Sequence, residues 1–255
     1  MKKERIDILL VEKGLADSRS QAQKLIMAGE ILAGDQQVLK PSQIYPSDTQ
    51  ITIKNKPKFV SRGGYKLEKA LIAFDFNDLN NKVCVDVGAS TGGFTDCLLQ
   101  FGAKKVYAID VGYGQLHERL RRDDRVVVME RTNVKDVENF PEPINLVVID
   151  ASFISLKSIL PSLTRWNFIK KLDLIALIKP QFEAGKSEAA RGKGVIKSAD
   201  IHQRVIEEVV GVAQGLGFHH HQTIESPIEG PKGNKEFLVY LDLKQFKTIE
   251  FKTIE

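Results

Sequence analysis

The sequence is poor in cysteine and in long apolar runs. Its two cysteines, Cys84 and Cys97, are too few for a disulfide framework or a cysteine-based metal site, and we expect both to be reduced core residues. No run of about 20 apolar residues is present, so we expect no membrane-spanning helix. The charged first residues, with Asp7 and Glu12 interrupting the apolar stretch that follows, argue against a signal peptide. We therefore expect a cytoplasmic protein without a membrane partner.

A strong charge of either sign is also missing. The formal net charge is +4 and the isoelectric point is near 8.9, values that permit a nucleic-acid partner without requiring one. Hydrophobic residues make up 42% of the 255 residues, enough to bury one large core and a second, small one. The composition therefore indicates a globular protein, and it fixes no oligomeric state.

Three consecutive histidines, His219 to His221, begin a predicted strand. Strand alternation sends the middle ring to the face opposite its two neighbours, so the three rings cannot converge on one ion. We therefore predict no metal site.

The first 60 residues predict a small α+β unit. Apolar residues at helical spacing indicate a first helix, and Ser18 with Gln21 forms a capping pair for a second, which Gly29 ends. The alternation in "DTQITI", residues 48–53, predicts a half-buried strand. Two helices and short strands are enough for a marginal small domain.

Charge and composition divide the chain into three segments. Residues 54–69 hold six basic residues against one acid, and we place the interdomain connection at residues 54–62. We predict a small unit with its linker at residues 1–60, a larger domain at 61–245 and a tail at 246–255 that repeats the pentapeptide FKTIE.

The larger domain predicts an α/β fold. Strand-like runs lie at 83–87, 105–109, 125–129, 145–150, 172–178, 219–225 and 236–241, and most of them are nearly continuously apolar. Helical patterns separate most of them, which indicates a Rossmann-like, mostly parallel, doubly wound sheet of seven strands. The last two strands are joined by "SPIEGPKGN", which is too short for a helix. We therefore expect these two strands to be antiparallel to each other.

The segment "DVGASTGGFT", residues 86–95, follows the first strand and opens a helix, where such sheets bind their ligands. Dinucleotide-binding loops carry G-x-G-x-x-G, but the glycines here are Gly88, Gly92 and Gly93, and the middle glycine of that pattern is missing. A phosphate-binding loop of the other common type needs Lys-Ser or Lys-Thr, which is also absent. The loop is therefore not built to hold a pyrophosphate.

Two acids accompany this loop. A carboxylate at Asp86 would repel a pyrophosphate but pair with an ammonium or sulfonium group. Asp110 closes the second strand, where an acid accepts hydrogen bonds from the ribose hydroxyls of an adenosine. These features predict S-adenosylmethionine as the cofactor. The alternative at this point is a generic tight turn between a strand and a helix.

Four polar residues stand at the ends or edges of the predicted elements: Lys66, Asp150, Lys179 and Glu236. The carboxyl ends of parallel strands meet at one edge of a sheet, so we expect these side chains to converge there. The arrangement resembles the Lys-Asp-Lys-Glu tetrad of the FtsJ-like ribose 2′-O-methyltransferases. The motifs that carry the resemblance are "SRGGYKL" (61–67), "DVGASTGGFTD" (86–96), "VVIDASF" (147–153), "LIKPQFE" (177–183) and "NKEFLVY" (234–240).

The resemblance implies a reaction that suits these residue types. A ribose hydroxyl is a weak acid, so its attack on a sulfonium methyl group requires help in losing the proton. Lys179 either accepts that proton or, as a fixed cation, stabilises the developing alkoxide. Asp150 and Glu236 would orient the lysines, and Lys66 would position the hydroxyl or its neighbouring phosphate. The alternative is a set of solvated surface charges, with Asp150 as a cap.

Residues 5–53 resemble an S4 RNA-binding domain, with Arg5, Ser18-Arg19 and the Gly29 turn in the expected pattern. Residues 1–60 hold ten Lys or Arg against seven acids, a net +3. Such a bias favours phosphate contacts that position a folded RNA without reading its sequence. The residues that we expect to contact RNA are Arg5, Arg19, Lys24, Lys54, Lys56, Lys58 and Arg62. The alternative is a helical cap with solvated charges.

An S4 unit joined to an FtsJ-like domain resembles the TlyA family of ribosomal RNA 2′-O-methyltransferases, also named hemolysin A-type proteins. The resemblance covers residues 1–243 and implies methylation of a cytidine ribose in ribosomal RNA, within ribosomal subunits. It also implies the cofactor contacts. These are Ser61, Gly63, Asp86, Gly88, Ala89, Ser90, Gly92, Gly93, Phe94, Thr95, Asp110, Asn133, Val134 and Asp150.

One departure from the family pattern lies in the linker. Members that modify both subunits carry Arg-x-Trp-Val there, whereas this chain has "KPKFV", with Phe59 before Val60. The choice of subunit therefore stays open. Two other functions also stay open: a non-catalytic RNA-binding protein of the ribosome, and a membrane-active hemolysin. The second is disfavoured, because the sequence shows neither a spanning segment nor a helix with a strongly basic face opposite a large apolar one.

Overall fold

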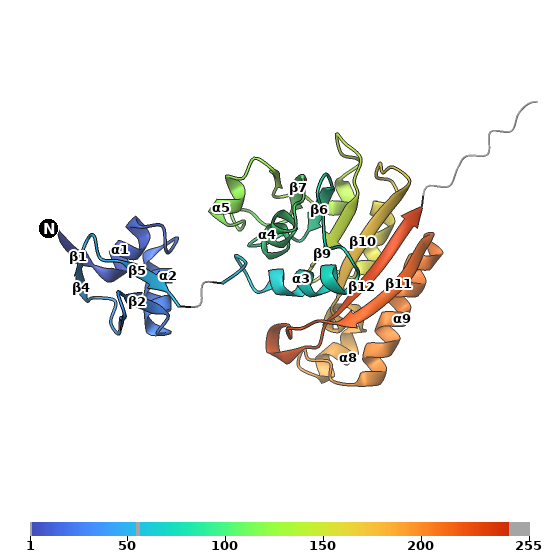
Figure 1. Ribbon diagram of the computed structural model, residues 1–255. Coiled ribbons are helices and arrows are strands. Elements are labelled where there is room, and N and C mark those ends of the chain that lie inside the picture. The colour runs from blue at the N-terminus through green and yellow to red at the C-terminus, as the bar shows by residue number, and fades with distance from the viewer. Residues whose placement is uncertain (1, 55–56, 245–255) are drawn as a thin grey trace, which may run out of the picture. The chain divides into compact units, whose positions relative to one another are not determined.

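The computed structural model describes residues 2–54 and 57–244. The chain divides into two compact units, Met1–Lys58 and Phe59–Glu255 (Figure 1). The division falls after Lys58, whereas the sequence places it after residue 60. Lys56, which we expected to contact RNA, and the tail at 246–255 lie outside the described residues.

The first unit packs two helices against short strands. Its elements are β1 (Lys3–Arg5), α1 (Ile6–Glu12), α2 (Arg19–Met27), β2 (Ile31–Ala33), β3 (Gln36–Gln37), β4 (Ile44–Pro46) and β5 (Ile51–Ile53). Strand β1 pairs with β4, and β2 pairs with both β3 and β5, all antiparallel. The hydroxyl of Ser18 accepts the backbone N–H of Gln21 at 3.2 Å and so caps α2, as the sequence predicts. Ile6, Leu10 and Ile26 belong to the buried core of this unit.

In the described part of the second unit, seven strands form one sheet in the order β11-β12-β10-β9-β6-β7-β8. They are β6 (Val83–Val87), β7 (Lys105–Ile109), β8 (Val126–Met129), β9 (Leu146–Ile149), β10 (Lys171–Ile178), β11 (Phe218–Glu225) and β12 (Phe237–Lys244). The five strands from β10 to β8 are parallel, and β12 is antiparallel to both β10 and β11. The predicted mostly parallel fold and the antiparallel last pair are both confirmed.

Helices cover both faces of this sheet. The α-helices are α3 (Gly63–Ala73), α4 (Gly93–Gln100), α5 (Glu118–Arg121), α6 (Leu160–Leu163), α7 (Pro180–Glu183), α8 (Lys186–Arg191) and α9 (Ala199–Gly215). Short 3₁₀ turns are η1 (Val134–Asp136), η2 (Leu156–Ser158) and η3 (Pro231–Gly233). On one face, Leu67 of α3 and Leu98 of α4 share a core with Cys84. On the other, Val205 of α9 packs in a second core with Val85.

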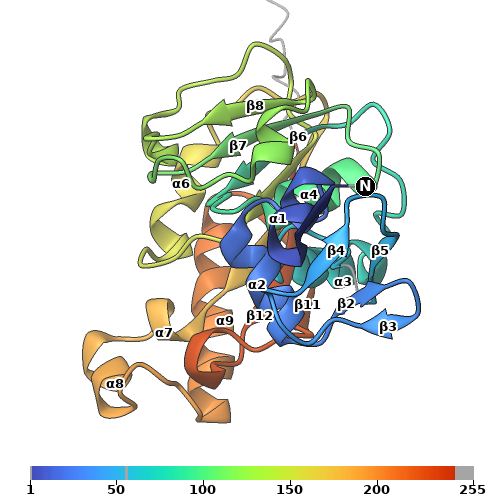
Figure 2. The same ribbon diagram turned by 90° about the vertical axis from the view of Figure 1, so that its left-hand side faces the viewer.

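The alternation of side chains along β6 explains why the central strands of this sheet are mostly apolar. Neighbouring residues of a buried strand face opposite cores, so neither face can be polar. Helix α9, orange in Figures 1 and 2, is long, and the short α7 and α8 come between the end of β10 and its start. No helix in the described residues is both long and apolar enough to cross a membrane.

Candidate active site

The glycine loop after β6 passes very close to the end of β9. Gly88 has φ +83°, and a Cβ there would lie 2.8 Å from the backbone carbonyl oxygen of Asp150. The backbone N–H groups of Gly88 and Ala89 donate to the carbonyl of Ile109 at 2.9 and 3.1 Å. Only glycine tolerates this backbone and this approach. The loop therefore packs closely against the ends of β7 and β9, and open space remains beside it.

That space is a cavity of about 620 Å³ at the carboxyl ends of β6, β7 and β9. Its described lining contains two carboxylates, Asp110 and Asp150, and no lysine or arginine. Six of the predicted cofactor contacts line it: Gly88, Ser90, Asp110, Asn133, Val134 and Asp150. A wall with carboxylates and without cations suits a positively charged ligand and disfavours a pyrophosphate.

Asp110 is held in place by the backbone around it. One carboxylate oxygen accepts the N–H of Gly112 at 2.7 Å, and the other accepts the N–H of Ser90 at 2.8 Å. The carboxylate therefore has a fixed position at the end of β7. Each oxygen keeps a lone pair for a further donor, such as a ribose hydroxyl.

Asp86 lies behind the loop and lines neither this cavity nor a smaller one that adjoins it. It is fully buried, and its Oδ2 accepts the hydroxyl of Thr95 at 2.6 Å. Its Oδ1 is buried and accepts no hydrogen bond from the described residues. Burial raises the pKa of Asp86 to about 7. Gly92 and Thr95, also predicted as cofactor contacts, lie outside both cavity linings.

A second cavity, of about 430 Å³, adjoins the first. Gly88, Ser90, Asp150 and Ser152 line both. The remaining predicted cofactor contacts, Ser61, Gly63, Ala89, Gly93 and Phe94, line this second cavity. It is also lined by Lys66 and Lys179, so a ligand that spans the two cavities meets both lysines.

The four predicted catalytic side chains form two ion pairs. Lys66 Nζ donates to Glu236 Oε2 at 2.6 Å, with both side chains buried. Lys179 Nζ lies 2.6 Å from Asp150 Oδ1 and donates to the hydroxyl of Ser152 at 2.8 Å. Three of the four line the second cavity, whereas Glu236 stands behind Lys66. Ser152, which sequence reasoning missed, follows Asp150 by two residues.

The sheet topology explains this convergence. Asp150 and Lys179 directly follow the parallel neighbours β9 and β10, so they leave the sheet at the same edge. Strand β12 runs antiparallel to β10, with Phe237 opposite Ile178. Glu236, at the start of β12, therefore reaches the same edge from the other direction.

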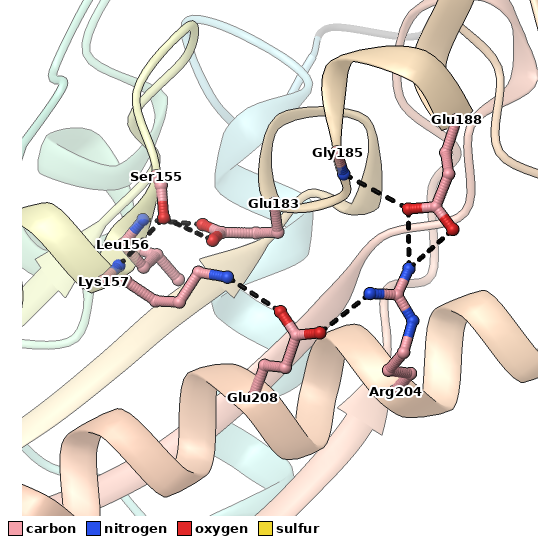
Figure 3. A network of polar contacts seen from close by, with 8 residues as sticks. All are labelled: Ser155, Leu156, Lys157, Glu183, Gly185, Glu188, Arg204 and Glu208. Carbon is pink, nitrogen blue, oxygen red and sulfur yellow. Dashed lines mark hydrogen bonds and ion pairs between the residues drawn. The ribbon is translucent and has the colours of Figure 1, made fainter.

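A polar network joins the loop that follows Asp150 to the segment that follows Lys179 (Figure 3). The buried carboxylate of Glu183 accepts the hydroxyl of Ser155 at 2.5 Å and the N–H of Leu156 at 2.6 Å. It thus binds the loop after β9 to α7, which follows Lys179. Burial raises the pKa of Glu183, against the lowering effect of the Ser155 hydrogen bond.

The network continues to the surface through α9. Lys157 donates to Glu208 at 2.8 Å, and Arg204 donates to Glu208 and to Glu188 at 2.8 and 2.6 Å. Glu188 also accepts the N–H of Gly185 at 3.2 Å. The site loops are therefore bound to the longest helix of the unit. Neither Glu183 nor these partners were identified from the sequence, because their contacts join segments far apart in the chain.

Phe153 stands out at the mouth of the first cavity. It is 90% exposed, and its φ of +64° is unusual for a residue other than glycine. Its ring lies 5.1 Å from that of Phe182. A strained, exposed aromatic residue beside a cavity points to a binding role.

In the first unit, two predicted RNA-binding arginines share one buried acid. The carboxylate of Asp7, fully buried, accepts two hydrogen bonds from Arg5 at 3.0 Å each, one from Arg19 at 2.8 Å and one from Gln23 at 2.9 Å. The hydrogen bonds from Arg5 hold the pKa of Asp7 well below its usual range. Asp7 thus fixes both guanidinium groups while each keeps an exposed part.

The other predicted RNA contacts are exposed where the structure describes them. Lys24, Lys54, Lys58 and Arg62 all lie at the surface. Arg62 also lines the second cavity. In the linker, Phe59 is buried, and its ring packs on Tyr65 at 5.1 Å between centroids. A Cβ on Gly64 would overlap this ring, so Phe59 occupies a fitted place in the second unit.

A seven-stranded mostly parallel sheet whose carboxyl edge carries a cation-free cavity beside paired lysines is typical of Rossmann-like methyltransferases. Sequence comparison agrees with this class. The chain belongs to the FtsJ-like methyltransferase family, which it matches over residues 59–243, and it carries an S4 domain at residues 4–51.

Relatives match nearly the whole chain. The 16S/23S rRNA (cytidine-2′-O)-methyltransferase TlyA of Mycobacterium tuberculosis is 41% identical, covering 98% of this chain and 94% of the relative. Hemolysin A of Brachyspira hyodysenteriae is 40% identical, covering 92% and 98%. A solved structure from Streptococcus thermophilus with a provisional hemolysin name is 42% identical, with a TM-score of 0.72, and covers 96% of this chain and 90% of that one.

Proposed function

We propose that this protein transfers a methyl group from S-adenosylmethionine to a ribose 2′-hydroxyl of ribosomal RNA, acting in the cytoplasm. The observation that carries the proposal is the pair of adjoining cavities, one lined by carboxylates without cations and the other by Lys66 and Lys179. The FtsJ-like domain supports the reaction, and the names of relatives support ribosomal RNA as substrate.

The residues of the larger cavity fit the cofactor. Asp110 would accept its ribose hydroxyls, and Asn133 with Val134 would border its adenine. Gly88, where a Cβ would strike the Asp150 backbone, lets the loop pass close to β9 and lines the cavity where its methionine part would lie. Asp86 lies behind the loop, so its carboxylate would act on the cofactor's positive charge through the loop rather than by contact. When bound, the cofactor supplies an electrophilic methyl group.

The lysine pairs would act on the incoming hydroxyl. Lys179 Nζ is held by Asp150 and Ser152, which line both cavities. As a cation it can hold the hydroxyl oxygen and stabilise the negative charge that develops there while the hydroxyl proton passes to water and the sulfur leaves with the electrons of its methyl bond. Lys66, fixed by Glu236, would hold the ribose or the neighbouring phosphate. Alignment of oxygen, methyl carbon and sulfur accounts for much of the acceleration in such a transfer.

Surfaces outside the cavities would hold the RNA. Phe153 offers an exposed ring on which the target base can stack. The exposed basic residues of the S4 domain, with Arg5 and Arg19 arranged around Asp7, would contact phosphates. Names of relatives support cytidine as the target nucleotide. In the linker, the buried Phe59 is the residue whose substitution would test which ribosomal subunit the protein modifies.

The deciding experiment is transfer of labelled methyl from S-adenosylmethionine to purified, unmethylated small and large ribosomal subunits. We expect label on a single ribose, mapped by ribose-methylation footprinting, and none with the Lys179→Ala variant. An absence of label on either subunit, together with no calorimetric binding of S-adenosylmethionine, would favour a non-catalytic RNA-binding protein.

A further inference from the structure

The histidine run in β11 forms a cluster away from the active site. His219 and His221 lie with Asp242 of β12, and one potential ligand atom from each lies within 4.8 Å of the others. Asp242 neighbours Asp173, near the start of β10, whereas Lys179 follows the other end of that strand. At about 3.3 Å per residue, the cluster is roughly 20 Å along β10 from the catalytic lysine.

A β-bulge brings these side chains together. Strand alternation puts His219 and His221 on one face, and His219 lies directly opposite Asp242. His221 is the extra residue of a bulge, because Gln222 is the next residue to pair, with Tyr240. A bulge re-aims the side chain that it carries, and His221 Nε2 reaches Asp242 Oδ2 at 3.0 Å.

Among the described residues no lysine or arginine pairs with Asp242, and its contact with His221 is an ion pair only when that ring is protonated. The Asp242 side chain is 4% exposed, and its Oδ1 is buried without a hydrogen bond from the described residues. The nearby cation, Lys171, lies 2.8 Å from Asp173, which also accepts the hydroxyl of Tyr240 at 2.8 Å. Asp173 lies directly opposite Asp242, so two buried carboxylates face each other beside one lysine. A buried carboxylate requires a compensating cation.

We propose that His219, His221 and Asp242 form a Zn²⁺ site. Imidazole nitrogens and a carboxylate oxygen are ligands that zinc takes in tetrahedral sites, where ligand atoms lie about 3.3 Å apart. The 3.0 Å contact between His221 and Asp242 has this spacing, and the exposed His219 ring can adjust by rotation about its side-chain bonds. The fourth position faces the exposed side of the cluster and is taken by water.

This proposal departs from the prediction made from the histidines alone. The middle ring does stand apart, since His220 pairs opposite Leu241. The third ligand comes from the neighbouring strand, which the spacing within the histidine run cannot show. Because β11 is an edge strand of the sheet, an ion bound by residues of both strands would link β11 to β12 and so stabilise this edge of the sheet.

Calorimetric titration of ZnCl₂ into the full-length chain tests the site. The chain is produced without an affinity tag, because histidine tags bind zinc, and it is stripped of metal with a chelator beforehand. We expect one saturable zinc ion per wild-type chain and a rise in melting temperature with added zinc. His219→Ala and His221→Ala should each weaken binding by at least about tenfold.

His220→Gln is the matched control, since it removes a histidine of the same strand that faces away from Asp242. It should bind zinc as the wild type does. Asp242→Asn should also weaken zinc binding. Because the Asp242 side chain is buried, this variant can fail to fold, and in that case the two histidine variants test the site. Lack of saturable zinc binding by the wild type overturns the proposal, as does an equal loss in His220→Gln or full retention in both alanine variants.

Discussion

At the scale of single residues, Lys179 is held by Asp150 and Ser152, which line both cavities, and a change of Lys179 should separate chemistry from binding. Lys179→Ala removes the positive charge beside the proposed hydroxyl, so we expect kcat to fall at least about 100-fold. The affinity for S-adenosylmethionine should change less than about twofold, because Lys179 lines only the smaller cavity. Single-turnover methyl transfer and calorimetry measure the two effects.

Lys82→Ala provides the control for this change. Lys82 is an exposed lysine just before β6, at the edge of the sheet opposite the site. It should leave both kcat and cofactor affinity unchanged. Turnover of Lys179→Ala within about threefold of the wild type would remove Lys179 from the catalytic machinery.

Asp86 gives a prediction about stability and pH. Its pKa is about 7 in the folded chain, above the ordinary 3.8, because burial disfavours the charged form. At pH values between 3.8 and about 7, unfolding therefore releases the proton that Asp86 carries in the folded chain. The resulting destabilisation is absent below pH 3.8, grows as the pH rises, and is complete above pH 7.

Asp86→Asn should remove this dependence, since the neutral amide can still accept the Thr95 hydroxyl. The unfolding free energy of the variant minus that of the wild type should therefore be larger at pH 8 than at pH 5. The expected increase is roughly 2–3 kcal/mol, at about 1.4 kcal/mol per pKa unit. Urea unfolding at both pH values measures it. A stability difference that stays constant between these two pH values would show that Asp86 is ionised throughout.

At the scale of elements, the loops after β9 and β10 depend on Glu183. Glu183→Ala leaves the N–H of Leu156 and the hydroxyl of Ser155 without their acceptor, which costs about 1–3 kcal/mol of unfolding free energy. Because the first of these loops carries Asp150 and Ser152, we expect kcat to fall about tenfold as well. Urea unfolding and turnover at saturating RNA measure the two losses.

The same network supplies a control and a rescue. Glu188→Ala removes a carboxylate at the solvent-exposed end of the network, where ion pairs contribute little, so both quantities should stay near wild type. Glu183→Gln, which keeps one acceptor oxygen, should restore part of kcat. If Glu183→Ala lowers stability and leaves kcat unchanged, the residue supports the fold without positioning the site.

Also at the scale of elements, the sequence predicts the positions of strands better than it predicts contacts between residues far apart in the chain. Strands such as β7 and β9 are almost continuously apolar because both of their faces are buried, so their positions follow from local composition. The convergence of Asp150 and Lys179 follows from parallel strands ending at one edge. The Glu183 contacts and the His221 bulge depend on pairings between distant segments and on strand register, which local patterns do not encode.

At the scale of the whole molecule, the proposed function assigns RNA binding to the first unit and chemistry to the second. The described lining of the larger cavity, where we propose that the cofactor binds, comes from residues 87 to 159, all of them in the second unit. Removing residues 1–58 should therefore weaken RNA binding more than about 10-fold and leave the affinity for S-adenosylmethionine within about twofold. The slope of log K against log salt concentration should become shallower by about 0.7–0.9 for each phosphate that the S4 domain neutralises.

The full-length and truncated chains are compared in two assays. Filter binding of ribosomal subunits at several salt concentrations measures RNA affinity, and calorimetry measures cofactor affinity. Circular dichroism of the truncated chain shows whether the second unit, which has its own two cores, keeps its fold. With the fold intact, the remaining basic residues, Arg62 among them, should still give weak, salt-sensitive binding. Equal losses of RNA and cofactor affinity in a folded truncation would mean that the S4 domain shapes the catalytic site itself, and the division of labour would be wrong.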